Sequence, residues 1–562
     1  MKPSTSRARL QKRIDAAMGR TPCDLIIRNV QYLDVFHCTW RTGDVAVADG
    51  AIVGLESGLK AQRVVNGKGK FLVPGFIDAH VHIESSLVTP DNFQAAVLPR
   101  GTTTAICDPH ELANVVGVGG IQYFLSAAEH LGMDLRVMLS SCVPATHFET
   151  NGGGEINAAS LASLLSSPKA LGLAEMMNVP GVLHNDPGIL EKLEAFSHGP
   201  IDGHCPLVRG QMLSAYASAG ISSCHESSQF DEAAEKLTKG ISVWIREGSV
   251  AKDLKTLIPL LNLATSTSIG FCTDDRNPLD ISSQGHVDYL VREAIRLGVA
   301  PEVAYRAASW SVARHYGLRY KGAIAPGYEA DLVLLDDAKT CAISQVYRLG
   351  ISVAEIMAPS ISAANVKNTV RAKIPEEADF LAPSGRVHVI GVEHGKIITS
   401  RHVMNHDDRG VARLSVLERY GKGSAPANAY VTGFGENFTG AIASSVGHDS
   451  HNLIVAGTNT RDMRAAFAAL AESGGGFCVV RDGAVQSRLE LPIGGLMTDQ
   501  SPAKVTESLK SLHKASQATG CILPEPFLQL AFLSLPVIPS LKLTDQGLVD
   551  VDRFEKIDVR AS

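Results

Sequence analysis

The 562-residue sequence predicts an α/β protein built on a (β/α)8 barrel of the TIM type, flanked by a small β-sandwich and a C-terminal α+β domain. Eight short apolar runs, each ending in polar residues, alternate with helical stretches from residue 73 to 316. Strand-like segments precede this region, and a third pattern begins near residue 385. The expected units are a leading segment (1–20), a composite sandwich (21–72 plus 317–380), the barrel (73–316) and a C-terminal domain (385–562).

Composition narrows the class of protein. Hydrophobic residues make up 45% of the chain and charged residues 20%, as in soluble globular proteins. A net charge of −6 predicts no nucleic-acid partner and no binding to anionic membranes. Ten cysteines form no Cys-x-x-Cys pair, which favours reduced thiols in a cytoplasm. A large cytoplasmic protein of this kind is expected to be a homo-oligomer.

The N-terminal segments come before the barrel. The first twenty residues are basic and have no apolar core, so they predict a solvated leading helix, with a transit peptide as the alternative. Residues 24–72 alternate like short strands, and Asp49-Gly50 between two apolar runs predicts a two-residue hairpin.

The eight apolar runs are the expected barrel strands. They are Ile77–His82, Thr103–Asp108, Leu135–Cys142, Ala170–Glu175, Ile201–His204, Ile221–His225, Ile241–Arg246 and Ser268–Asp274. Because reactive side chains collect at the C-terminal ends of the strands in this fold, the polar residues ending these runs should face one mouth.

The first of these strands carries two histidines. His80 and His82 are two residues apart, so their side chains should leave the same face of the strand while Val81 turns into the protein. Imidazole pairs at this spacing suit a zinc, manganese or iron ion. A lone His-x-His is weak evidence, and it gains weight from the other strand ends.

The other strand ends add further metal-ligand types. They offer Asp108 with His110 and Glu111, then Glu175, His204, His225 and Asp274. Taken singly, each histidine could be a buried structural residue, and Asp274 could cap a helix. Taken together they predict two divalent metal ions bridged by Glu175, with His80, His82 and Asp274 on one ion and His204 and His225 on the other. A water shared by two cations has its pKa lowered toward neutrality.

The segments after the barrel complete the chain. Residues 301–318 read as one helix, and residues 322–335 as a turn followed by a strand of the sandwich. The C-terminal unit has hairpin signals at His394-Gly395 and Asp482-Gly483 and a helix near residues 461–473. The apolar segment 522–541 contains Glu525 and four prolines, so it does not predict a transmembrane helix.

Several motifs resemble one known superfamily. Pro74-Gly-Phe-Ile-Asp-Ala-His-Val-His and Gly327-Tyr-Glu-Ala-Asp-Leu-Val look like the two ends of the amidohydrolase signature. Segments beginning at His82, Cys107, Gly172, Asp202 and Cys272 are similar to the bacterial adenine deaminases of that superfamily, as are Gly440–Asn452 and Leu491–Met497. The resemblance covers nearly the whole chain after residue 20.

The resemblance implies a reaction and a set of cofactors. It implies hydrolysis of adenine, a small molecule, to hypoxanthine and ammonia, with manganese or iron favoured and zinc possible. Asp274 is the candidate to take a proton from water and pass it to the departing amine. Glu111, Asp108, Arg276, His448 and His451 are the candidates to hold the purine or close the site.

Two other functions are weighed against this one. Related hydrolases of cyclic amides resemble each other in bridging their metals with a carbamylated lysine on the fourth strand, where this chain has Glu175. An amidohydrolase acting on another base or a cyclic amide is the first alternative, and Glu175 in place of that lysine argues against close kinship with the cyclic-amide hydrolases. A catalytically silent barrel scaffold is the second, and it should lack one or more ligands, whereas all six are present.

Overall fold

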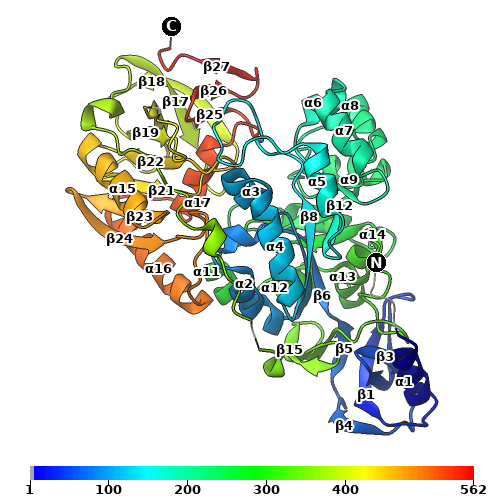
Figure 1. Cartoon of the computed structure of the whole chain (residues 1–562). Coiled ribbons are helices and arrows are strands. Elements are labelled where there is room, and N and C mark those ends of the chain that lie inside the picture. Colours follow the sequence, from blue (N-terminus) through cyan, green and yellow to red (C-terminus); the bar gives the residue numbers. More distant parts are fainter. Residues whose placement is uncertain (1–5, 358, 424, 562) are drawn as a thin grey trace.

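The computed structural model describes residues 6–357, 359–423 and 425–561. Figure 1 shows the barrel between two smaller parts, a sheet built from the N-terminal strands and a larger C-terminal domain. The two smaller parts lie on different sides of the barrel and are separated by it. The predicted α/β barrel with two accompanying sheet domains is confirmed.

Eight parallel strands form the barrel. They are β6 (Phe76–Val81), β7 (Thr102–Cys107), β8 (Asp134–Leu139), β9 (Ala170–Met176), β10 (Ile201–Gly203), β11 (Ser223–Cys224), β12 (Ser242–Arg246) and β13 (Ile269–Cys272). Each overlaps one predicted strand. The last strand closes onto the first where the Asp274 amide donates to the His80 carbonyl (3.0 Å) and the His82 amide donates to the Asp274 carbonyl (3.2 Å).

Helices follow the strands around the barrel. They are α2 (Pro90–Val97), α3 (His110–Val116), α4 (Val118–His130), α5 (Ala158–Leu164), α6 (Val179–Leu183), α7 (Pro187–Ala195), α8 (Gly210–Ser218), α9 (Phe230–Thr238), α10 (Leu254–Leu257), α11 (Pro278–Ser283), α12 (Val287–Arg296), α13 (Pro301–Ala307) and α14 (Trp310–His315). The prediction of one helix over 301–318 is wrong, because the helix is interrupted between α13 and α14. There the Ala308 carbonyl accepts a hydrogen bond from the Ile77 amide of β6 (2.8 Å).

The small sheet combines both flanks of the barrel. Its strands are β1 (Cys23–Asp34), β2 (Thr39–Ala48), β3 (Ala51–Gly54), β4 (Ala61–Asn66), β5 (Phe71–Pro74), β14 (Leu332–Asp337), β15 (Ala342–Arg348) and β16 (Ile351–Ser352). β5 pairs with both β1 and β14, which joins the two segments, and Asp49-Gly50 turns between β2 and β3. The exposed helix α1 (Arg7–Ala17) lies beside this sheet.

The predicted end of the sandwich at residue 380 is too late. The strands of that sheet stop at Ser352, and the chain then packs against the C-terminal domain. Phe380 is buried beside Phe467, and the Val366 carbonyl accepts a hydrogen bond from the Gly494 amide (2.7 Å). The burial of Phe380 assigns residues up to 380 to the C-terminal domain, and the order of residues in the sequence does not show this assignment.

The C-terminal domain contains two sheets. The larger has β17 (Arg386–Val392), β18 (Thr399–Asn405), β19 (Val411–Leu417), β20 (Ala427–Thr432), β21 (Ala441–Ser444), β22 (Leu453–Gly457), β23 (Gly476–Arg481) and β24 (Ala484–Glu490). The smaller has β25 (Leu541–Thr544), β26 (Gly547–Asp550) and β27 (Glu555–Ile557), and the helices are α15 (Thr460–Glu472), α16 (Pro502–Ala518) and α17 (Pro526–Ala531). Among the described residues, no helix has both the length and the apolar character needed to cross a bilayer.

The C-terminal domain is fixed to the barrel close to its mouth. The Thr498 amide donates to the Leu87 carbonyl (2.9 Å), and the Thr89 amide donates to the Thr498 carbonyl (3.2 Å). Apolar side chains of both parts share one buried core. At this junction the segment around residue 448 contacts residues that follow the second barrel strand, through His448 to Glu111 and through Asp449 to His110.

Candidate metal centre

Six buried side chains from five strand ends meet at the barrel mouth. They are His80, His82, Glu175, His204, His225 and Asp274. The Nε2 atoms of His80 and His82 lie 3.0 Å apart, so the i, i+2 spacing does place both imidazoles on one side of the strand end. Their rings approach edge to face, while the His80 and His225 rings are stacked at 3.9 Å.

Glu175 lies at the centre of the group. Its Oε2 is 2.7 Å from His204 Nδ1 and 3.2 Å from His225 Nε2. Its Oε1 is 3.3 Å from His82 Nε2 and 3.6 Å from His80 Nε2. Each carboxylate oxygen thus faces a different pair of histidines, which is the arrangement that a bridging ligand requires. Burial raises the pKa of Glu175, but His225 and His80 outweigh burial and hold that pKa well below the usual carboxyl range.

Asp274 follows the last barrel strand. Its Oδ1 lies 3.2 Å from His82 Nε2 and 3.7 Å from His80 Nε2. The side chain that caps the next helix, α11, is Asn277, which accepts from the Asp280 amide (2.9 Å). The alternative that Asp274 is a helix cap is therefore wrong.

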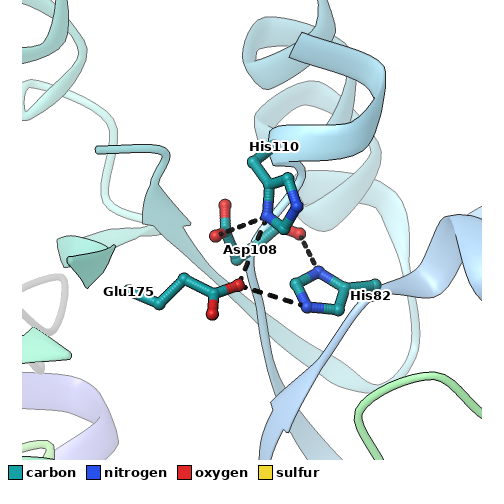
Figure 2. A group of neighbouring side chains, drawn as sticks. All are labelled: His82, Asp108, His110 and Glu175. Atoms are coloured by element: carbon teal, nitrogen blue, oxygen red, sulfur yellow. Dashed lines mark hydrogen bonds and ion pairs between the residues drawn. The ribbon is translucent and has the colours of Figure 1, made fainter. Parts of the chain in front are cut away.

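Figure 2 shows His82 and Glu175 of this group beside two residues that follow β7, Asp108 and His110. His110 Nδ1 lies 3.0 Å from Asp108 Oδ2 and 3.4 Å from Glu175 Oε1. His82 Nδ1 is 3.0 Å from the Asp108 carbonyl oxygen, so Nδ1 donates to that carbonyl and Nε2 is the nitrogen that faces Glu175. We assigned no role to His110 from sequence, although it lies in the same Asp-Pro-His-Glu motif as Asp108 and Glu111.

The donor set fits divalent cations. Glu175 Oε1 and His204 Nε2 are buried and have no hydrogen-bond partner. Nitrogen and oxygen ligand atoms converge within 4.8 Å in several overlapping groups, which are His82–Asp108–His110–Glu175, His80–His225–Asp274, Glu175–His204–His225 and His82–Asp274–Asp275. Mixed imidazole and carboxylate donors of this kind suit Mn²⁺, Fe²⁺ and Zn²⁺.

A pocket lies over these side chains and has walls of two kinds. The polar part of its lining includes Glu111, Asp275, His448 and Asp449 beside the residues described above. Apolar side chains form the rest of the lining. Met177, Val250 and Ala251 come from the barrel, and Ile397, Phe532, Leu535 and Ile538 come from the C-terminal domain. We call the four C-terminal side chains the pocket roof. The C-terminal residues could not be found from sequence, since no local pattern marks them as facing a site in another domain.

Some of the predicted substrate-binding residues line the pocket, and others lie behind its wall. Glu111 and His448 line the pocket, with His448 Nδ1 3.2 Å from Glu111 Oε1. His451 lies behind them, and its Nε2 is 3.2 Å from Glu111 Oε2. Asp108 also lies behind the pocket wall, where its Oδ1 accepts a hydrogen bond from the Ser140 hydroxyl (2.7 Å).

Arg276 does not reach the pocket. Its buried guanidinium donates to the Gly285 carbonyl (2.9 Å), the Glu247 carbonyl (2.8 Å) and the Gln284 side chain (2.8 Å). The prediction that Arg276 lies in the substrate site is therefore corrected. Its N–H groups donate to those acceptors and hold the loop after β13 instead.

The sequence matches two family models. The amidohydrolase family model matches residues 71–387, and the adenine deaminase C-terminal domain model matches residues 391–555. An adenine deaminase of Gluconobacter oxydans is 48% identical over 557 residues, covering 96% of this chain and 98% of the relative. The chain belongs to the adenine deaminase family.

Other adenine deaminases are similar over the same span. One of Cereibacter sphaeroides is 48% identical over 564 residues, with 98% of this chain and 99% of the relative covered. One of Methylobacterium sp. is 49% identical over 563 residues, with 97% and 99% covered. Both matched models meet near residue 390, where the larger C-terminal sheet begins with β17. The adenine deaminase C-terminal domain is thus the part that supplies the apolar roof of the pocket.

Proposed function

We propose that the protein hydrolyses adenine to hypoxanthine and ammonia at a two-metal centre in the barrel mouth. The observation that carries this proposal is the position of Glu175 between two pairs of histidines in the lining of a pocket that also has apolar walls. A flat purine with a polar edge suits apolar walls combined with a few convergent polar groups. Membership of the adenine deaminase family supports adenine as the base.

The same residues are proposed to hold the two ions. His80, His82 and Asp274 hold one ion, His204 and His225 hold the other, and Glu175 bridges them. When bound, two divalent ions lower the pKa of a shared water and so supply a nucleophile at neutral pH. Manganese or iron is the proposed pair, and the experiment below includes zinc because its preferred ligands overlap theirs.

The side chains then manage protons and the position of the base. A C–O bond forms at C6 of adenine, the C6–N bond breaks and ammonia leaves. The Asp274 carboxylate takes the proton of the attacking water and delivers it to the departing amine, a role worth about 10²–10⁴-fold in rate. Glu111 and His448 hold the polar edge of the purine, while Phe532 and its apolar neighbours exclude water from its face.

The setting of the reaction is proposed on other grounds. All ten cysteines are free thiols, nine of them buried, which supports a cytoplasmic enzyme in a reducing compartment. We propose a homo-oligomer that acts on small molecules and has no nucleic-acid or membrane partner.

Ammonia release from adenine tests the proposal. The purified protein is stripped of metal, reloaded with Mn²⁺, Fe²⁺ or Zn²⁺, and assayed with adenine beside adenosine, cytosine and a hydantoin. Metal-dependent turnover of adenine alone, with two ions per chain, is the expected result. Turnover of the hydantoin or cytosine instead, with two ions bound, would keep the centre and replace the substrate. Adenine turnover without any ion would reject the two-metal centre.

A further inference from the structure

Arg246 ends the seventh barrel strand and has no role in the reaction as proposed above. It is the last residue of β12, lines the pocket, and is only 4% exposed. Burying a guanidinium is costly unless carboxylates surround it, so its partners indicate what it does there.

Three carboxylates from three loops surround this guanidinium. Nε and Nη2 donate to Asp253 Oδ2 (3.1 and 3.0 Å). Nη1 and Nη2 donate to the two oxygens of Glu226, with Nη2 to Oε2 at 3.1 Å. Nη1 also donates to Asp274 Oδ2 (2.9 Å). These bonds use all five N–H groups of an arginine, so none remains for a substrate.

The bond to Asp274 sets the direction of its carboxylate. Asp274 Oδ2 is held by Arg246, and Oδ1 therefore faces His82 Nε2 at 3.2 Å. The Asp274 backbone is fixed by its two bonds to the first strand. The terminal torsion of an aspartate, however, has broad and roughly two-fold preferences, so its plane needs a partner to define it.

The other two carboxylates connect Arg246 to the rest of the centre. Glu226 directly follows His225, and Asp253 comes from the loop after β12. We propose that Arg246 is a positioning residue, a planar clamp that fixes the Asp274 carboxylate toward the metal centre and ties it to the His225–Glu226 turn. The inference deepens the proposed function and rests on it.

The experiment uses removal of the guanidinium and its replacement in trans. Arg246→Ala is expected to lower kcat by about 10²-fold, as loss of an outer partner of a metal ligand typically does, with KM changed less than about threefold. Methylguanidinium at millimolar concentration should restore at least about tenfold of that loss in Arg246→Ala. It should not act on Arg246→Met, whose side chain occupies the space. Arg246→Lys should stay impaired because an ammonium cannot replace the planar fork.

A matched control uses a second, largely buried arginine, Arg348, whose side chain is 11% exposed. Arg348 donates to Asp331 Oδ1 (2.6 Å) and Glu329 Oε2 (3.3 Å) in the small sheet. Arg348→Ala removes the same group away from the pocket, and methylguanidinium should leave its kcat unchanged.

A second readout does not depend on the substrate. The visible absorption of the Co²⁺-loaded protein reports on ligand geometry, and it should change in Arg246→Ala and return with methylguanidinium. An unchanged Co²⁺ spectrum and an unchanged kcat in Arg246→Ala, or in Arg246→Lys if the alanine variant does not fold, would overturn the positioning role. Equal rescue of the methionine and alanine variants would also overturn it. Failure of adenine turnover in the wild type rejects the reaction alone, because the Co²⁺ spectra still decide the role of Arg246.

Discussion

The barrel carries two buried charge clusters, one near each end, and they are completed differently. Near the N-terminal end of β8, Lys321 Nζ contacts Asp134 (3.1 Å), Glu329 (2.8 Å) and Asp331 (2.9 Å), and we call this group with Arg348 the basal cluster. Its carboxylates face cations of the chain itself. Burial raises the pKa of Asp134, but Lys321 and Arg136 outweigh burial and hold it well below its usual range.

The mouth group, by contrast, surrounds Glu175 with imidazoles. Those imidazoles can offer lone pairs to a cation, and Glu175 Oε1 has no hydrogen-bond partner. The carboxylates of the basal cluster are paired with cations of the chain, whereas for the mouth group we propose added metal ions. The comparison teaches that the kind of cation facing a buried carboxylate separates a structural cluster from a metal centre.

Glu175→Gln is the strongest test of this contrast. The amide keeps the shape but loses the charge that bridges two ions, so adenine turnover should fall by more than about 10³-fold. Metal analysis should find fewer than two ions per chain. A variant that retains both ions and near wild-type turnover would show that Glu175 is not the bridge.

Lys321→Met tests the basal cluster. Removal of this cation leaves the buried carboxylates of Asp134 and Asp331 and the partly buried Glu329 with one fewer cation, so the free energy of unfolding should fall by about 3–5 kcal/mol. Denaturant titration measures this change. Two ions per chain and wild-type kcat below the melting temperature should remain, and loss of metal in this variant would contradict the separation of the two clusters.

Metal removal should lower the stability of the protein through the mouth group and leave the basal cluster unchanged. Ions that bind only the folded chain stabilise it by about 2.7 kcal/mol at a hundredfold excess over Kd, so chelation should lower the Tm of the wild type. Thermal unfolding with and without chelator measures the difference. The same difference should be small in Glu175→Gln, and an equal shift in both proteins would place the bound ions elsewhere.

Lys542 offers the smallest test, as a buried cation with no carboxylate ion pair among the residues described. Its Nζ donates to the Ile397 and Phe532 carbonyls (both 2.9 Å), which hold the pocket roof, and burial lowers its pKa to about 7. Between pH 7 and about 10.4 the unfolded chain then binds the extra proton, so stability rises with pH by at most about 1.4 kcal/mol per unit.

Comparison with Lys542→Met isolates this effect. The stability of the wild type relative to that variant should increase from pH 7 to 9, as measured by denaturant titration at each pH. A difference that is flat over this range would mean that Lys542 stays protonated in the folded protein.

Local patterns predicted much of the fold and part of the site. The eight barrel strands and the hairpins at Asp49-Gly50 and Asp482-Gly483 follow from alternation and turn residues, which act over a few positions. The break between α13 and α14 could not be predicted, because the Ala308 carbonyl is taken by a strand more than two hundred residues earlier.

The sequence by itself determined that His80 and His82 leave one face of a strand and that Glu175 ends the fourth strand, since strand period and barrel order are local properties. Only the tertiary structure decided which partners those residues have. His110 reaches Glu175, Arg246 holds Asp274, and Phe532 covers the pocket because closure of the barrel and docking of the C-terminal domain bring distant segments into contact. Contacts of that kind depend on packing over the whole chain, and no short window of sequence contains them.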